Sequence, residues 1–215
     1  LEPGVSVRFV QQGEAIPACD LVIIPGSKST VSDLASLRQN GWDIDIAAHV
    51  RRGGRVLGLC GGYQMLGRMV HDPHGLEGKA GSVPGLGLLD VETTLAPEKR
   101  VTQTQALHVA SGQAISAYEI HLGKTTGAAC NSPFATVSGK PEGATSPDGR
   151  ISGTYLHGCF SSDGFRHAFL RALGASSSSF QYDATVDATL DALASHLERH
   201  IAVDQLLALA EPVHL

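Results

Sequence analysis

The sequence predicts an α/β fold with a central, mostly parallel sheet, an antiparallel extension and flanking helices. Residues 1–90 alternate short apolar strand patterns with helical patterns, which is the order of a parallel sheet with right-handed crossovers. Residues 86–137 carry strand patterns with few helical signals between them, which favours an antiparallel or mixed extension. The 25 glycines have no fixed period, so we expect them to mark turns and close approaches of the backbone.

The elements follow from periodicity and from the residues that end each run. The expected strands are residues 5–10, 21–24, 55–59, 86–94, 101–110, 114–121, 134–137 and 150–155. The expected helices cover residues 29–38, 44–51 and 164–173, and one more begins near Gly62 or Tyr63. Pro25 and Gly26 end the second strand, Ser29 supplies N-cap chemistry for the first helix, and Gly41 follows that helix.

The chain divides at a short serine-rich linker. Residues 1–174 form the expected α/β domain, and residues 175–215 form a linker and C-terminal helices. Asp183 is expected to cap a helix with an apolar stripe at Val186, Leu190, Leu193, Leu197 and Ile201. This spacing gives one apolar face, so we expect the helix to pack on the domain or on a partner.

Composition excludes several classes of protein. The 215 residues include 16 Lys and Arg and 21 Asp and Glu, which gives a formal net charge of −5. A chain with this charge has no basic surface field to attract nucleic acid. The sequence shows no secretory leader and no apolar run long enough for a membrane span, so no membrane partner is expected. The four cysteines are scattered without a CxxC pair, which predicts neither a metal clip nor a disulfide framework and indicates a reducing, cytoplasmic compartment.

Cys60 stands in the strongest chemical motif, Gly58-Leu59-Cys60-Gly61-Gly62, between a buried strand and a helix. This is the thiol form of a nucleophile elbow, in which a strained turn needs neighbours without a Cβ. The helix start would favour the thiolate and predicts a lowered thiol pKa, and the Gly61 amide would face a tetrahedral oxyanion. The alternative is a buried structural cysteine in a glycine-rich turn.

His157 is the candidate base, because it lies just past a strand end, where parallel-sheet proteins keep reactive groups. Nine other histidines compete with it. His196 and His200 share a helix face, but the HLERH string is not HExxH, so we expect a solvated surface there and no metal site.

Two further segments offer polar groups. The loop Pro25-Gly26-Ser27-Lys28-Ser29-Thr30 lacks Walker A spacing, and a backbone amide of Gly26 or Ser27 could instead point to the Cys60 pocket. An ordinary strand-to-helix turn would have the same sequence. Alternation places Glu119 and His121 on one side of a strand, either as a polar wall or as an exposed sheet face.

Four segments, PGSKST, GLCGGYQMLG, AYEIHLGKTTG and GTYLHGCF, occur in the order and spacing of one known family. Together they resemble the triad-type (class I) glutamine amidotransferases, in their cobyric acid synthase branch. The resemblance extends to GLGLLDVETTL, SPDGRISGTYLHG and the C-terminal LDALASHLERH helix. It implies a flavodoxin-like class I amidotransferase fold.

The resemblance implies glutamine hydrolysis, with Cys60 as the nucleophile and His157 as the proton shuttle. Gly26 and Gly61 match oxyanion-hole positions, and Gln64, with Ser27 nearby, matches substrate-binding positions. L-glutamine would be the substrate, and no cofactor is expected in this domain. Ammonia would pass to an N-terminal ATP-binding synthetase domain, which would use ATP and Mg to amidate the b, d, e and g carboxylates of adenosylcobyrinic acid a,c-diamide.

The sequence departs from the family pattern in two ways. The broader family has Glu two residues after the histidine, where this chain has Cys159. The third catalytic member is then absent, supplied by backbone, or replaced by another group such as Glu119 with His121 beside it. The synthetase domain and the first strand of the fold are also expected upstream, so an isolated copy should make no cobyric acid and have low glutaminase activity.

Two other functions stay open at this point. One is another cysteine hydrolase on the same scaffold, of a peptidase-like or γ-glutamyl-hydrolysing kind. The other is a non-catalytic docking domain that uses its C-terminal helix as the contact surface.

Overall fold

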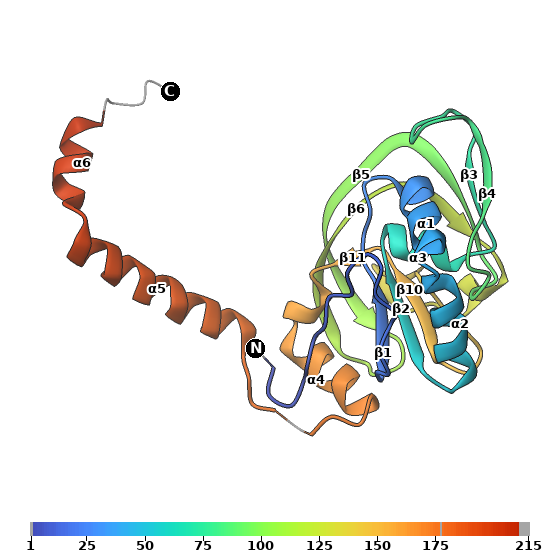
Figure 1. Cartoon of the computed structure of the whole chain (residues 1–215). Helices are drawn as coiled ribbons and strands as arrows, with labels where there is room; N and C mark the ends of the chain where they lie inside the picture. Colours follow the sequence, from blue (N-terminus) through green and yellow to red (C-terminus); the bar gives the residue numbers. More distant parts are fainter. Residues whose placement is uncertain (1, 177, 211–215) are drawn as a thin grey trace.

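The computed structural model describes residues 2–176 and 178–210, and the body of the molecule contains two sheets (Figure 1). The first sheet has the order β1 (Leu21–Ile24), β2 (Arg55–Leu59), β10 (Ile151–Thr154) and β9 (Ala144–Thr145). β1, β2 and β10 run parallel, and β9 is an antiparallel edge strand. The expected parallel sheet is therefore confirmed.

The second sheet is mostly antiparallel. Its path is β11 (Leu156–His157), β6 (Ala114–Thr126), β5 (Glu92–His108), β3 (Met69–Asp72) and β4 (Gly81–Pro84), with β7 (Ala135–Val137) on β5 and β8 (Lys140–Glu142) on β7. The expected antiparallel extension is confirmed, but as a separate sheet. The prediction missed the β3–β4 hairpin, and it divided β5, which continues through an irregular register between Thr94 and Lys99.

The helices of the body are α1 (Thr30–Gln39), α2 (Trp42–Arg51), α3 (Gly61–Leu66) and α4 (Asp163–Ala172), close to the predicted ranges. β2 lies between β1 and β10, and its Val56 and Leu57 are each 1% exposed. Leu34 of α1 and Ile46 of α2 are buried in the same apolar core as Val56. This core fixes the carboxyl end of β2, where Cys60 follows.

The predicted strand over residues 5–10 is wrong. Within the described residues this stretch pairs with no strand, and Val7 and Phe9 are 73% and 82% exposed. Alternation makes a strand only where a neighbour accepts its hydrogen bonds and covers one face. The chain is instead held further along, where the Trp42 indole donates to the Glu14 carbonyl at 2.7 Å.

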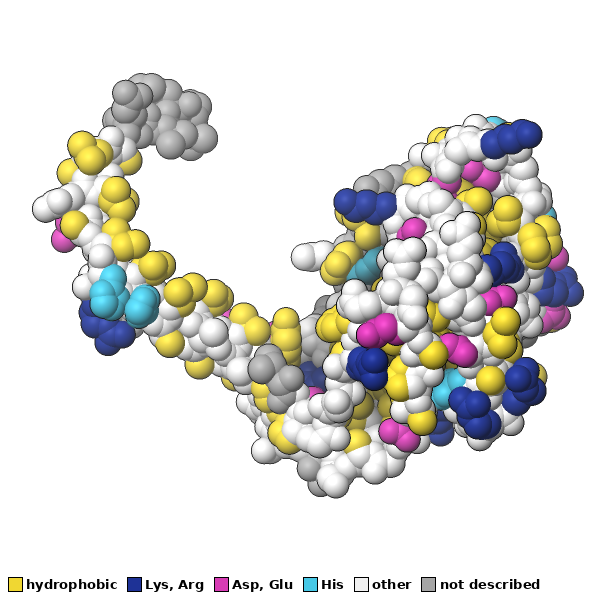
Figure 2. Space-filling view, in the orientation of Figure 1, with side chains coloured by type: hydrophobic (Ala, Val, Ile, Leu, Met, Phe, Trp, Pro, Cys, Tyr) yellow, Lys and Arg dark blue, Asp and Glu magenta, His cyan; other side chains and the backbone are white. Residues whose placement is uncertain are grey.

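The C-terminal helices α5 (Tyr182–His200) and α6 (Val203–Leu209) extend away from the body (Figure 1). Figure 2 shows the apolar side chains in a row along them, and Leu190, Leu193 and Leu197 are exposed. The helix therefore does not bury this stripe on its own domain. Packing on a partner stays a prediction, and Gln181, not Asp183, occupies the N-cap position.

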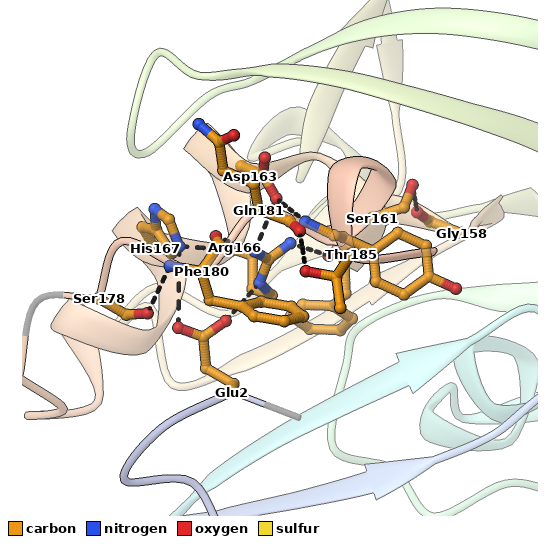
Figure 3. A network of polar contacts seen from close by, with 12 residues as sticks. Glu2, Gly158, Ser161, Asp163, Arg166, His167, Ser178, Phe180, Gln181 and Thr185 are labelled. Carbon is orange, nitrogen blue, oxygen red and sulfur yellow. Dashed lines mark hydrogen bonds and ion pairs between the residues drawn. The ribbon is translucent and has the colours of Figure 1, made fainter. Parts of the chain in front are cut away.

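A polar network holds the base of α5 against α4 (Figure 3). The buried Arg166 guanidinium binds Glu2 at 2.7 Å and Asp163 at 2.6 Å, and it also donates to the Phe180 carbonyl. The Asp163 carboxylate accepts the Tyr182 amide at 2.9 Å. The first turn of α5 is thus attached to the body, whereas Leu190, Leu193 and Leu197 further along the helix are exposed. Within the described residues, no helix is both long and apolar enough to cross a bilayer.

Candidate active site

Cys60 occupies a strained turn between β2 and α3. Its φ of 52° and ψ of −111° lie in a region that side chains rarely adopt. The Cys60 amide donates to the Thr154 carbonyl at 2.8 Å, and the Cys60 carbonyl accepts the Gln64 amide at 3.1 Å. A Cβ on Gly62 would overlap the Ile24 carbonyl, so only glycine lets the turn pack this closely on β1. The predicted nucleophile elbow is present.

Cys60 is 8% exposed, and its thiol donates to the carbonyl oxygen of Ile120 at 3.3 Å. Burial raises the pKa of the thiol, and the Gly61 amide opposes this increase. The sequence-based prediction of a lowered pKa is therefore wrong. The dipole of the short helix and one amide do not compensate for the loss of water around the sulfur.

His157 lies beside the elbow. Gly26 lies between the two groups, because a Cβ built on Gly26 would lie 3.3 Å from His157 Cε1 and 3.5 Å from Cys60 Cβ. The imidazole stacks on Tyr118 at 5.1 Å, and its buried Nε2 has no hydrogen-bond partner within the described residues. Burial lowers the pKa of His157, and the Ile120 carbonyl acts in the opposite direction. A neutral imidazole next to a neutral thiol can accept its proton.

Gly26, Ser27 and Gly61 converge at the mouth of the elbow. A Cβ on Gly61 would lie 2.8 Å from Ser27 Cβ and 2.9 Å from Ser27 N. The two backbone segments therefore touch, as an oxyanion hole built from two loops requires. The Ser27 hydroxyl donates to Asp33 at 2.5 Å and accepts the Ser29 amide at 2.9 Å. The roles of Gly26 and Gly61 in an oxyanion hole, and of Ser27 in substrate binding, stay predictions.

Gln64 lies one helical turn after Cys60 and is 3% exposed. Its carbonyl accepts the Thr30 hydroxyl at 2.8 Å, and its amide donates to the Leu122 carbonyl at 3.0 Å and to the Tyr155 hydroxyl at 3.3 Å. These bonds join α3 to α1, to β6 and to the chain after β10. A contact with bound glutamine stays a prediction.

Glu119 and His121 lie on the same side of the strand, as alternation predicted, with Glu119 Oε2 and His121 Nε2 3.7 Å apart. Glu119 stands opposite Leu156 in the β6–β11 pair, whereas Tyr118 stands opposite His157. Neighbouring residues of a strand point to opposite faces, so this register directs Glu119 away from the imidazole. This register argues against Glu119 as the third catalytic group. The His121 ring stacks on the Tyr155 ring, with the two ring centroids 3.8 Å apart.

Cys159, at the position of the family's glutamate, is 1% exposed. Burial raises the pKa of its thiol to about 12, so the group is neutral and cannot supply a negative charge. The acceptor that does lie at the site is the Ile120 carbonyl. The sequence allowed for a backbone group here but could not identify Ile120, because a main-chain oxygen has no signature in the sequence.

The described residues contain no group of three His, Cys, Asp or Glu side chains arranged to hold a metal ion. His196 and His200 do contact each other, with ring centroids 4.4 Å apart, on the exposed surface of α5.

Known proteins resemble this chain over nearly its full length. The family described as CobB/CobQ-like glutamine amidotransferase domain matches residues 1–165. Cobyric acid synthase of Cereibacter sphaeroides is 61% identical over 210 residues, which is 97% of this chain and 44% of that protein. Cobyric acid synthase of Bradyrhizobium diazoefficiens is 58% identical over 211 residues, 98% of this chain and 44% of that protein. The chain thus spans less than half the length of these relatives.

Solved structures agree on the fold. A crystal structure of a glutamine amidotransferase superposes with a TM-score of 0.59 at 18% identity, covering 80% of this chain and 88% of the other. A structure of PurLQS from Thermotoga maritima gives a TM-score of 0.57 at 15% identity, covering 77% and 85%. With the match over residues 1–165, these findings establish that the chain belongs to the CobB/CobQ-like glutamine amidotransferase family.

Proposed function

We propose that this chain hydrolyses L-glutamine to glutamate and ammonia with Cys60 as the nucleophile and His157 as the base. The observation that carries the proposal is that Cys60 and His157 both lie within 3.5 Å of the point where a Cβ on Gly26 would stand. The raised thiol pKa and the lowered imidazole pKa imply that both groups are neutral at rest. Proton transfer therefore accompanies attack on the substrate.

In the first half-reaction, Cys60 gives its proton to His157 and its sulfur attacks the side-chain carbonyl carbon of glutamine. The amides of Gly26 and Gly61 donate to the oxyanion of the tetrahedral intermediate. The imidazolium then protonates the leaving nitrogen, so the C–N bond breaks, ammonia departs and a thioester remains. In the second half-reaction, His157 takes a proton from water, the hydroxide attacks the thioester, and the thiol leaves with that proton.

The Ile120 carbonyl takes the place of a third catalytic side chain in this proposal. This carbonyl faces both the Cys60 thiol and the His157 imidazole. It can therefore keep the imidazole in place while the proton moves from the thiol to the ring. A carbonyl carries only a partial negative charge and stabilises the imidazolium less than a carboxylate does. We therefore expect slow hydrolysis by this chain alone.

The ammonia serves a synthetase domain of a longer protein. That domain binds ATP and Mg and amidates the b, d, e and g carboxylates of adenosylcobyrinic acid a,c-diamide, in the cytoplasm. The support is that relatives 61% identical to this chain are named cobyric acid synthase and are more than twice as long. The exposed apolar stripe of α5 is the surface we assign to this partner. No cofactor is required in the chain itself.

Incubation with L-glutamine, with glutamate measured by a coupled dehydrogenase, tests the hydrolysis. Cys60 should also be labelled by a glutamine-like diazoketone, as seen by peptide mass spectrometry, and Cys60→Ala should show neither result. Absence of both in the intact chain would reject the amidotransferase activity. Faster cleavage of γ-glutamyl peptides than of glutamine would instead support another cysteine hydrolase.

The docking-domain alternative is tested in the longer protein. If the domain only docks, Cys60→Ala leaves both assembly and glutamine-dependent amidation unchanged. If it is catalytic, the variant still assembles and uses added ammonium, but not glutamine.

A further inference from the structure

Glu142 is a buried carboxylate that the mechanism above does not use. It ends β8 and is 9% exposed. Its Oε1 accepts the Tyr155 amide at 2.7 Å, and its Oε2 accepts the Thr154 hydroxyl at 2.7 Å. Both oxygens of one carboxylate thus bind two consecutive residues of the chain just before His157.

The segment that Glu142 binds is the link between the two sheets. Thr154 is the last residue of β10, in the first sheet, and Leu156 is the first of β11, in the second. The Thr154 hydroxyl also accepts the Leu156 amide at 3.1 Å. Glu142 and Thr154 together therefore fix the direction in which the chain leaves β10 and presents His157.

The same segment supports the nucleophile. The Thr154 carbonyl accepts the Cys60 amide at 2.8 Å, so Thr154 is bound on one side by Glu142 and on the other by the elbow. A shift of Thr154 would move the Cys60 turn and the His157 strand together.

The backbone of Glu142 is itself held in place. Glu142 pairs with Ala135 of β7, and Ala144 pairs with Gly153 of β10. Gly143 between them has φ +71°, and a Cβ there would overlap the Gly153 carbonyl. The carboxylate therefore projects from two paired strands and not from a loose loop.

Several titratable groups face Glu142 from the packed elements. They are Glu119 of β6, Tyr63 of α3 and Cys159, which follows β11. Burial, with a smaller effect of Glu119, raises the pKa of Glu142 to about 7, while the Tyr155 amide and the Thr154 hydroxyl oppose the increase. Near neutral pH, protonation would turn one of its acceptor oxygens into a donor.

We propose that Glu142 is a positioning residue that holds His157 and the Cys60 elbow in register by binding Thr154 and Tyr155. This inference rests on the proposed function for its kinetic consequence, but its geometric content concerns the Cys60–His157 pair alone. Protonation of Glu142 weakens the hold on Thr154, so it should lower activity on the acidic side of neutrality.

Variants of the two partners test the proposal in the intact chain. Glu142→Gln keeps the side-chain volume but replaces one acceptor with a donor, and Thr154→Val removes the hydroxyl while keeping the shape. Each should lower kcat for glutamine hydrolysis by about 10-fold or more, with KM changed less than about twofold, because small displacements of reacting groups are costly. The double variant should be no slower than the slower single variant, since both remove the same interaction.

Two matched variants control for simple loss of packing. Thr154→Ser retains the hydroxyl and should restore most of the activity lost in Thr154→Val. Thr104→Val removes another buried threonine hydroxyl, which bonds to the Thr102 carbonyl outside this segment, and should leave kcat unchanged. Thermal melting verifies that each variant is folded. If Glu142→Gln does not fold, the comparison of Thr154→Val with Thr154→Ser tests the positioning role.

A second readout does not depend on glutamine. The pH profile of Cys60 alkylation by iodoacetamide should shift in Glu142→Gln and Thr154→Val toward the profile of His157→Ala, because the imidazole is displaced from its place beside the thiol. If the wild type hydrolyses no glutamine but these profiles shift, the proposed function fails and the positioning role stands. Folded variants with unchanged profiles and kcat within twofold of wild type would overturn the positioning role.

Discussion

The Cys60 thiol and the Ile120 carbonyl oxygen are 3.3 Å apart, and this same oxygen faces the His157 imidazole. A main-chain acceptor thus contacts both members of the proposed catalytic pair. Cys159, which stands where the family's glutamate would be, is neutral because burial raises its pKa to about 12.

This relationship predicts different outcomes for two buried cysteines. Cys60→Ala should abolish glutamate release, because the nucleophile is lost. Cys159→Ala should keep kcat within about twofold while lowering stability by about 1 kcal/mol through lost packing. Steady-state kinetics and denaturant unfolding measure both, and a large loss of kcat in Cys159→Ala would contradict the assignment of the Ile120 carbonyl.

The pH dependence of the free site follows from burial. Because the pKa of the Cys60 thiol is raised, alkylation of Cys60 should keep increasing with pH beyond the ordinary thiol range. Because the pKa of His157 is lowered, its NMR titration should have a midpoint below 6.5. A plateau in alkylation below pH 8 would indicate a resting thiolate and would contradict the neutral pair.

Gly26→Ala should impair catalysis more than folding. The added Cβ would lie 3.3 Å from His157 Cε1 and 3.5 Å from Cys60 Cβ, so it would press the imidazole away from the thiol. We expect kcat/KM to fall by about 10-fold or more. Gly81→Ala is the matched control, since a Cβ there meets no atom within 4 Å; an equal loss in both variants would point to a general effect.

The strained turn at Cys60 should be visible in stability. At φ 52° any residue with a Cβ is strained. Cys60→Gly should therefore be more stable toward denaturant than Cys60→Ala by about 1 kcal/mol, although glycine normally lowers stability by increasing the entropy of the unfolded chain. A less stable glycine variant would show that the turn carries no such strain.

Glu142 should give the protein a pH-dependent stability. Its pKa is about 7 in the folded state and 4.5 ordinarily, so between these values the folded protein retains a proton that the unfolded chain has released. The unfolding free energy should therefore decrease by about 3 kcal/mol as pH rises through this window. Denaturation of wild type and Glu142→Gln across the window measures this, and parallel curves would contradict the raised pKa.

The sequence predicted the parts of the site that local chemistry encodes. Cys60 could be found because its turn needs glycines, and His157 because it follows a strand end. The thiol pKa was predicted wrongly, because burial depends on β6, which is distant in the sequence. The role of Glu142 could not be predicted either, since a single carboxylate between a proline and a glycine is typical of a surface turn.

Sequence patterns were also silent about what covers an apolar face. The apolar stripe of α5 and the alternating side chains of residues 5–10 predict burial equally well, yet most of these apolar side chains are exposed. Periodicity identifies which side chains share a face. It does not identify the surface that meets them.

The short length of β11 has a consequence for which mutations the site can tolerate. Its pairing with β6 begins at Leu156, opposite Glu119, and so stops one residue short of Ile120. If the β6–β11 pairing continued to Ile120, the Ile120 carbonyl oxygen could accept a hydrogen bond within the sheet instead of facing Cys60. No substitution at position 120 removes the main-chain carbonyl, whereas an insertion or deletion in β6 would change which residue places its carbonyl beside Cys60.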